Sequence, residues 1–303
     1  MSAKLTLKIL IFLFTAGLLV SYWFLPLTPL EFGAKYNNSN FNPGNESSGM
    51  QFYSNMRFPD RRISYRIERC PLQKVNEMEQ AFEILENLTP LEFYPVEQGE
   101  QIKVMCNSSN KVEGGLFIAG EGGPTNITKS GKFNVILSGK ILLIRESKCA
   151  RPNVALHELL HVLGFNHSTN PRNVMYPIVR CDQTIGKDVV QLLNKLYAIE
   201  SLPDLGFENI SAVIEGRYFS ANISLRNIGL AKSEKANLKI CLDNESFKEI
   251  EIPELDIGHG RKIVLKNFYV RKFKVSEIKF TLEHLKEELN KTNNEAILRS
   301  EVN

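Results

Sequence analysis

The chain has 303 residues, of which 43% are hydrophobic and 23% charged. This composition is that of a globular protein of about two domains and excludes a disordered or fibrous chain. The net charge of +3 provides no basic stripe of the kind that nucleic-acid-binding proteins use, and the six aspartates, never spaced as D-x-D, argue against calcium loops.

The N-terminal region predicts a membrane anchor. Residues 9–30 carry no charge and follow two lysines within residues 1–8, and a helix of this length would be ~33 Å long, close to a bilayer's hydrocarbon core. We therefore predict a transmembrane signal anchor at 9–30 with residues 1–8 in the cytoplasm. A cleaved signal peptide and secretion are the alternative, but no A-x-A-like site follows. Residues 31–56 are rich in Asn, Gly, Ser and Pro and predict a flexible stalk.

Asn-x-Ser/Thr sequons place the rest of the chain outside the cytoplasm. An Asn-rich sequence makes some sequons by chance, but this chain has more than its composition predicts, which favours a glycoprotein. Asn166 lies within the histidine motif described below, where a glycan would fit poorly. The sequons begin at Asn37, Asn45, Asn87, Asn107, Asn126, Asn166, Asn209, Asn222, Asn244 and Asn290.

The cysteines are consistent with an oxidising compartment. Four of them lie in the first two thirds of the chain and allow three pairings. Cys70 and Cys106 each follow a strand-like run, whereas Cys149 and Cys181 bracket the histidine motif. These positions favour the pairs 70–106 and 149–181, and Cys241 is predicted to be an unpaired thiol.

Residues 57–203 alternate strand and helix patterns, which predicts a mixed α+β domain. Helices are expected at 72–88, 153–163 and 187–197, and strands at 62–67, 92–96, 102–105, 116–118, 134–137 and 141–144.

Residues 204–303 predict an all-β sandwich of the immunoglobulin type. Short alternating runs are separated by turns that contain Asn, Gly or Pro. His259 and His284 in this region are interpreted as turn and surface residues. The expected strands are 212–214, 218–225, 236–242, 249–252, 262–270 and 277–282.

The motif that indicates chemistry is HELLHVLGFNH at residues 157–167. On a helix, His157 and His161 project from one face and can reach a single zinc ion. Gly164 allows the helix to end, so that His167 can supply a third ligand. Three imidazoles leave one coordination position open, as in catalytic zinc sites, and Glu158 is placed to take a proton from zinc-activated water.

Two other interpretations of the motif are less consistent with its spacing. Histidines on the surface of an amphipathic helix are one, but the full spacing rarely arises by chance. A structural zinc would need a fourth Cys or His, and none follows nearby. The adjacent Glu158 also favours catalysis over a structural ion.

The motif resembles that of the metzincin metalloproteases, and within them the matrixin family. Residues 173–177, NVMYP, are similar to the matrixin Met-turn, which implies that Met175 forms the floor beneath the zinc. Tyr176 directly follows Met175, whereas a tyrosine ligand would lie at the position of Pro177, so Tyr176 is not expected to bind zinc. The resemblance covers about residues 57–200 and implies a metzincin-like domain with a twisted mixed sheet and three helices.

Other features depart from the animal matrixins. No fourth histidine precedes His259, so a second, structural zinc is not expected. The six aspartates also provide too few of the carboxylates with which animal matrixins bind calcium. No latency cysteine lies between residues 31 and 56.

The C-terminal region is similar to CARDB-type immunoglobulin-like domains in two segments, FSANISLRNIGL at 219–230 and ELNKTNNEAIL at 288–298. This resemblance implies a spacing module or one that binds a cell-surface partner.

Together these observations predict a membrane-anchored, outward-facing zinc endopeptidase that acts on peptides or proteins. An edge strand at 134–137 or 141–144 is expected to pair with extended substrate. The rival hypothesis is a surface adhesion or scaffold protein whose metal site is vestigial.

Overall fold

The computed structural model describes residues 49–107, 112–113, 116–144, 149–271, 275–283 and 287–299, together with Thr15. All the described helices and strands belong to one compact unit, Ser39–Asn303. Within these ranges no helix is both long and apolar enough to cross a membrane. Apart from Thr15, the predicted anchor at 9–30 lies outside the described residues, as do most of the predicted stalk and His284.

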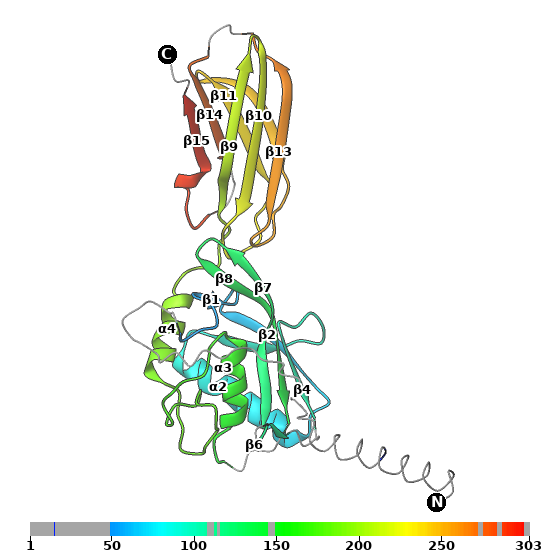
Figure 1. Cartoon of the computed structure of the whole chain (residues 1–303), viewed down its shortest axis with the longest axis vertical. Coiled ribbons are helices and arrows are strands. Elements are labelled where there is room, and N and C mark those ends of the chain that lie inside the picture. Colours follow the sequence, from blue (N-terminus) through cyan, green and yellow to red (C-terminus); the bar gives the residue numbers. More distant parts are fainter. Residues whose placement is uncertain are drawn as a thin grey trace, which may run out of the picture. The chain divides into compact units, whose positions relative to one another are not determined.

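The first domain contains a mixed six-stranded sheet (Figure 1). Strands β1, β8, β4, β2 and β3 are parallel neighbours in that order, and β7 pairs with β8 in the antiparallel direction. A separate short hairpin joins β5 and β6. The strands are β1 Met56–Arg57, β2 Arg62–Glu68, β3 Glu92–Pro95, β4 Ile102–Cys106, β5 Val112–Glu113, β6 Leu116–Phe117, β7 Gly120–Ser130 and β8 Phe133–Leu143.

Three helices complete this domain, as predicted: α2 Leu72–Leu88, α3 Asn153–Val162 and α4 Lys187–Tyr197. Helix α3 packs against α2, β7 and β8. Every residue of α3 is buried, so both of its faces are enclosed by the domain core. A helix enclosed in this way cannot rotate without disrupting that core, and this fixes the direction of its side chains.

The predicted strands 134–137 and 141–144 are one continuous strand, β8. Gly139 interrupts the apolar pattern because α3 lies very close to it: a Cβ atom there would come within 2.5 Å of Val162 Cγ1. Strand β8 also pairs on both sides, with β7 and with β1 and β4. The prediction that this segment is a substrate-binding edge is therefore wrong.

Among the described strands, the edge of the sheet beside α3 is β7, a strand that was not predicted from the sequence. Its residues, GEGGPTNITKS, contain three glycines and a proline, which usually indicate a turn. Gly122 is required because its Cβ would lie 2.4 Å from the Glu158 carbonyl oxygen. The glycines thus permit close packing of strand on helix.

The stalk ends earlier than predicted, because residues 50–56 are folded against the first domain. Gln51 forms a bridge with Phe165, and its side-chain amide exchanges two hydrogen bonds with the backbone of Met56. Met56 is fully buried. A composition dominated by polar residues concealed the few apolar side chains that fix this segment.

The second domain is the predicted β-sandwich, built from a three-stranded and a four-stranded sheet in the order β13-β10-β9 and β12-β11-β14-β15. Strand β11 reads ANLKICL, and its alternate side chains are buried, as expected for one face of a sandwich. Its elements are β9 Leu205–Glu215, β10 Tyr218–Asn227, β11 Ala236–Leu242, β12 Glu245–Ile252, β13 Gly260–Tyr269, β14 Glu277–Glu283, η1 Thr292–Asn294 and β15 Glu295–Arg299.

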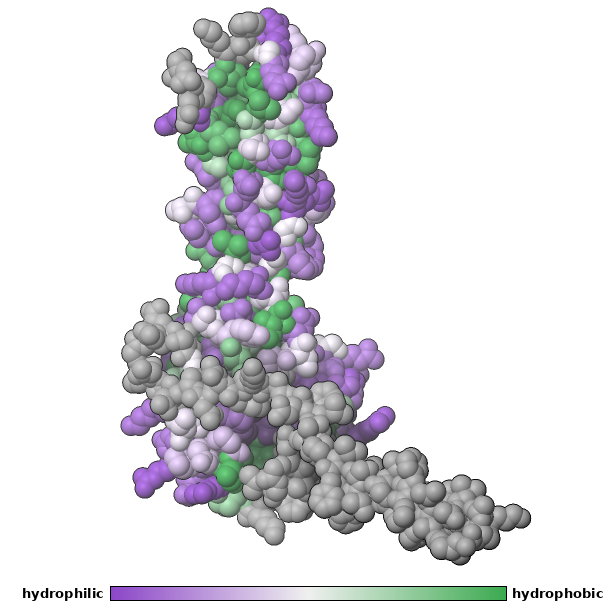
Figure 2. Space-filling model, in the orientation of Figure 1, coloured by the Kyte–Doolittle hydropathy of each residue, from purple (hydrophilic) through white to green (hydrophobic). Residues whose placement is uncertain are grey.

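The face of the molecule seen in Figure 2 is mostly hydrophilic, and its hydrophobic residues gather toward the top of the view, on the sandwich. On the three-stranded sheet, four large apolar side chains are about half exposed: Val213, Tyr218, Val264 and Tyr269. Asn222, a sequon residue, pairs in register with Val264 on this sheet and is exposed. The sheet's outer face is therefore partly apolar and carries a candidate glycan acceptor.

Candidate metal centre

The three predicted histidines come together at the end of α3. Nε2 of His161 lies 3.0 Å from Nε2 of His157 and 3.1 Å from Nε2 of His167. His157 and His161 lie on adjacent turns of the buried helix α3, and His167 reaches them from the segment that follows this helix. Within the described residues, this is the only cluster of three or more His, Cys, Asp or Glu side chains suited to a metal ion.

Hydrogen bonds orient two of the imidazole rings. His157 Nδ1 lies 2.7 Å from the Val174 carbonyl oxygen, and His161 Nδ1 lies 2.8 Å from that of Phe165. A carbonyl only accepts, so each Nδ1 must carry the proton, and each Nε2 presents a lone pair to the cluster. This is the arrangement that metal-binding histidines normally have.

The protein environment keeps the three imidazoles uncharged. Burial lowers the pKa of His157 to about 4, although the hydrogen bond to Val174 opposes this shift. Burial, together with the neighbouring His157 and His167, lowers the pKa of His161 well below its ordinary value. Burial also lowers the pKa of His167. Neutral nitrogens can bind a cation at neutral pH without first losing protons.

Gly164 makes the turn that brings His167 to the cluster. Its φ is +93°, a conformation that strongly favours glycine. Its N–H donates to the His161 carbonyl, and the Phe165 N–H donates to that of Leu160, which ends the helix as a C-terminal glycine cap does. A Cβ on Gly164 would lie 2.7 Å from Met56 Cβ, so the folded part of the stalk also requires glycine here.

Met175 lies in the segment that supports His157. It is fully buried, its N–H donates to Asn173 Oδ1, and its carbonyl accepts from the Ser168 N–H. The preceding residue, Val174, is the one whose carbonyl orients His157. The segment around Met175 is thus hydrogen-bonded to His157 in the helix and to Ser168, the residue directly after His167.

Glu158 is buried between α3 and β7, with 5% of its surface exposed. Burial, reinforced by the nearby Glu121 carboxylate, raises the pKa of Glu158 to about 8. A Cβ at Gly120 would come within 2.7 Å of Glu158 Cγ and 2.9 Å of Oε1. Gly120 therefore leaves the space that the glutamate side chain occupies. A carboxyl group with such a pKa is suited to exchanging a proton near neutral pH.

Replacing Gly120 by Ala is expected to displace the Glu158 side chain and lower kcat by about 10- to 100-fold, because small misplacements of a reacting group are costly. Gly123→Ala is the matched control, since a Cβ at Gly123 meets nothing within 4 Å. Steady-state kinetics and bound zinc are to be measured for both variants. Equal kcat values for the two would show that Gly120 does not position Glu158.

Several contributors to the centre were not predicted. The Phe52 ring stacks on His161 with 5.8 Å between centroids, and Gly120 and Gly122 set the distance between β7 and α3. In the sequence, the only indication that Gly120 and Gly122 face the same neighbour was their spacing of two residues. The accepting carbonyls of Phe165 and Val174 had no signal, since any residue type supplies a carbonyl.

Both predicted disulfides are present: Cys70–Cys106 and Cys149–Cys181. Cys241 is a free thiol, as predicted. The second disulfide joins residues 32 positions apart and closes a segment that contains all three histidines, Glu158 and Met175. It therefore ties the two ends of the metal-binding segment together.

Removing this disulfide as Cys149→Ala/Cys181→Ala is expected to lower the free energy of unfolding by about 3–4 kcal/mol, because the unfolded chain regains the entropy of an open loop. Urea denaturation measures the change, and Cys241→Ala is the control for the loss of a sulfur atom. An unfolding midpoint of the double variant equal to that of Cys241→Ala would contradict the prediction.

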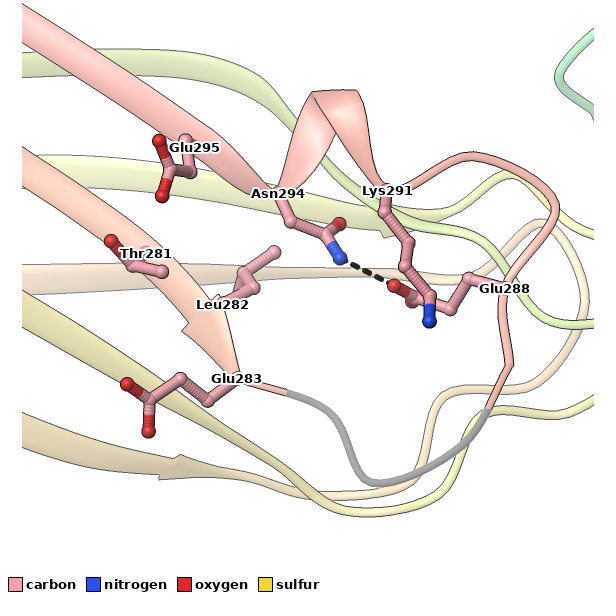
Figure 3. A pocket seen from close by; sticks show the side chains of 7 residues that line it. All are labelled: Thr281, Leu282, Glu283, Glu288, Lys291, Asn294 and Glu295. Carbon is pink, nitrogen blue, oxygen red and sulfur yellow. Dashed lines mark hydrogen bonds between the residues drawn. The ribbon is translucent and has the colours of Figure 1, made fainter.

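A pocket in the sandwich is chemically different from the histidine cluster. Figure 3 shows Lys291, Glu288 and Asn294 among the side chains that line it, and Asn294 donates a hydrogen bond to Glu288. Glu288 also accepts from the Leu205 N–H. Its buried carboxylate thus serves to join η1 to the start of β9, and the pocket contains no histidine or cysteine among its lining residues.

The donor set of the cluster fits zinc. Three nitrogens around a tetrahedral zinc ion stand roughly 3.3 Å apart, and the two closest separations found here, 3.0 and 3.1 Å, are near that value. Zinc accepts neutral imidazole nitrogens, and three protein ligands with a fourth open position characterise its catalytic sites. His157, His161 and His167 are therefore the residues that would hold the ion.

Comparisons with known proteins agree with this geometry. Residues 57–198 match the family described as Matrixin, and residues 202–297 match the family described as CARDB. No curated protein matches the chain.

Many solved structures resemble parts of the chain. Myroilysin shares 11% identity over 46% of this chain and 95% of its own, with a TM-score of 0.32. The CARDB domain of a Pyrococcus furiosus protein, solved in complex with di-metal ions, shares 16% identity over 32% of this chain and 84% of its own, with a TM-score of 0.27.

Proposed function

We propose that this chain, whose residues 57–198 match the matrixin family, hydrolyses peptide bonds at one zinc ion held by His157, His161 and His167, with Glu158 as general base. The observation that carries this proposal is the convergence of three neutral imidazoles, with a buried glutamate, Glu158, directly after the first of them in the sequence. Zinc bound there would supply the Lewis acidity that polarises a carbonyl group and lowers the pKa of water.

Glu158 performs the proton transfers. Its carboxylate removes a proton from the attacking water molecule, and its protonated form then donates that proton to the leaving amide nitrogen. Burial and the Glu121 carboxylate raise the pKa of Glu158, which favours its protonated form, and a bound cation would favour the carboxylate. The buried position beside Gly120 excludes bulk water from the carboxyl group.

Strand β7 binds the substrate in this proposal. It pairs with β8 along one side, and no other described strand pairs with its opposite side. An extended peptide can add to such an edge through main-chain hydrogen bonds. The same strand contacts Glu158, so a peptide on β7 lies next to the reacting group.

The experiment that tests this function is digestion of a denatured protein by the full chain, with and without a zinc chelator. Cleavage should stop when zinc is removed and resume when zinc is added back. Cleavage that persists in the chelator would exclude the zinc mechanism. A zinc-loaded protein that cleaves neither proteins nor peptide libraries would favour the scaffold hypothesis.

We also propose that both domains lie outside the cytoplasm and that residues 9–30 anchor them to the membrane. Two disulfides are typical of an oxidising compartment. Among the described sequons, Asn87, Asn107, Asn126, Asn209, Asn222, Asn244 and Asn290 are exposed, whereas Asn166 is partly buried and accepts a hydrogen bond from the His167 N–H. Membrane fractionation with N-terminal sequencing separates an intact anchor from a cleaved signal peptide.

A further inference from the structure

The β7–β8 hairpin connects the metal centre to the sandwich. One end of β7 contacts Glu158 through Gly120 and Gly122. The other end, at Ser130, is buried against the turn that follows β10. Both domains belong to the same compact unit. The eleven residues of β7 therefore form one strand that extends from the metal centre to the sandwich.

Hydrogen bonding fixes the hairpin end. Ser130 is fully buried, and its hydroxyl donates to the Gly229 carbonyl oxygen at 2.6 Å. The accepting turn is itself rigid: Asn227 is fully buried, its amide donates to the carbonyls of Ala231 and Leu255, and its Oδ1 accepts two backbone N–H groups.

The backbones of the two domains approach each other too closely for a side chain on either. A Cβ on Gly131 would lie 2.8 Å from the Ile228 carbonyl oxygen, and one on Gly258 would lie 2.6 Å from the Lys129 carbonyl oxygen. Both glycines have positive φ, +53° and +73°. The close backbone contact between the domains therefore requires glycine both in the β7–β8 turn of the first domain and in the turn before β13 of the sandwich.

A small hydrophobic cluster lies beneath this contact. Phe133 and Val135, at the start of β8, pack with Leu230 of the sandwich, and all three are buried. Ile257 and Leu289 pack against the same cluster. An apolar contact of this kind opposes the free motion that linked domains otherwise show.

We propose that the sandwich is a positioning element of the active site, because it holds the end of the β7–β8 hairpin and thereby keeps the substrate-binding edge of β7 in place. This inference rests on the proposed function, in which extended substrate pairs with β7. Among the described strands, β7 pairs only with β8, so attachment at the tip of the hairpin limits how far the free edge of β7 can move. The sandwich residues involved, Asn227, Gly229 and Gly258, act through β7 and do not touch substrate.

The test compares two glycine substitutions in the sandwich of the full chain. Gly258→Ala places a methyl group against Lys129, whereas Gly216→Ala has a similar positive φ of +62° but meets nothing within 4 Å. We expect Gly258→Ala to raise KM for long peptides by about tenfold with kcat within about twofold. Weaker pairing with β7 lowers the binding of the substrate and of the transition state by the same amount, and such a loss appears in KM. Gly216→Ala should keep the KM of the unmodified chain.

Thermal unfolding and zinc content are measured in parallel, so that a general loss of folding is recognised. Ser130→Ala removes only the hydroxyl donor to Gly229 and provides a second variant in case Gly258→Ala does not fold; it should raise KM in the same direction, and Ser130→Thr should restore it. Equal KM values for Ser130→Ala and the unmodified chain, or for both glycine variants, would overturn the inference. An unmodified chain without peptidase activity would overturn the proposed function instead.

Discussion

Glu158→Gln is expected to lower kcat/KM by about 10²–10⁴-fold while zinc remains bound, because an amide cannot accept the proton of the attacking water. Glu158 is not among the three residues whose nitrogens converge, so the metal site should survive the substitution. Glutamine nearly matches glutamate in size, and the space that Gly120 leaves for it still accommodates the side chain.

The measurement is steady-state cleavage of a peptide together with the zinc content of the purified protein. Glu83→Gln is the control, because Glu83 is an exposed residue of α2 in the same domain and its substitution makes the same replacement of a carboxyl group by an amide. Activity of Glu158→Gln within tenfold of that of the control would refute the general-base role.

His161→Ala is expected to abolish zinc binding and with it all measurable peptidase activity, a loss of more than about 10³-fold. His161 is the central ligand of the three, since its Nε2 is close to that of both other histidines. Two remaining imidazoles form an incomplete site for catalytic zinc, which uses three protein ligands.

His259→Ala is the matched control for this loss, because the His259 side chain is 70% exposed and its nearest charged partner is Asp256, at 3.8 Å. Zinc content after dialysis and peptide cleavage are compared for the two variants. A His161→Ala protein that retains one zinc per chain would show that the ion is held elsewhere.

Local patterns in the sequence were sufficient to predict the helices, the disulfide pairs and the histidine cluster. The cluster follows from the i, i+4 spacing of His157 and His161 and from the helix end at Gly164, which depend on neighbours in the chain. The sandwich strands could be predicted because alternate residues are buried, as in β11.

The misinterpreted segments depend on contacts between distant residues. Gly122 and Gly139 indicate turns when considered locally, but each lies in a strand where α3 leaves no room for a side chain. Likewise, Met56 becomes buried only because Gly164 and the turn after α3 pack against it. Propensity cannot reveal such approaches, since tertiary packing overrides it.

The glycines of β7 limit how the cleavage preference of this enzyme can be engineered. A side chain at Gly122 would collide with the main chain of α3, and one at Gly120 would displace Glu158. Gly123, in contrast, has free space around it. A library that aims at new peptide preferences should therefore vary Gly123 and retain both inward-facing glycines.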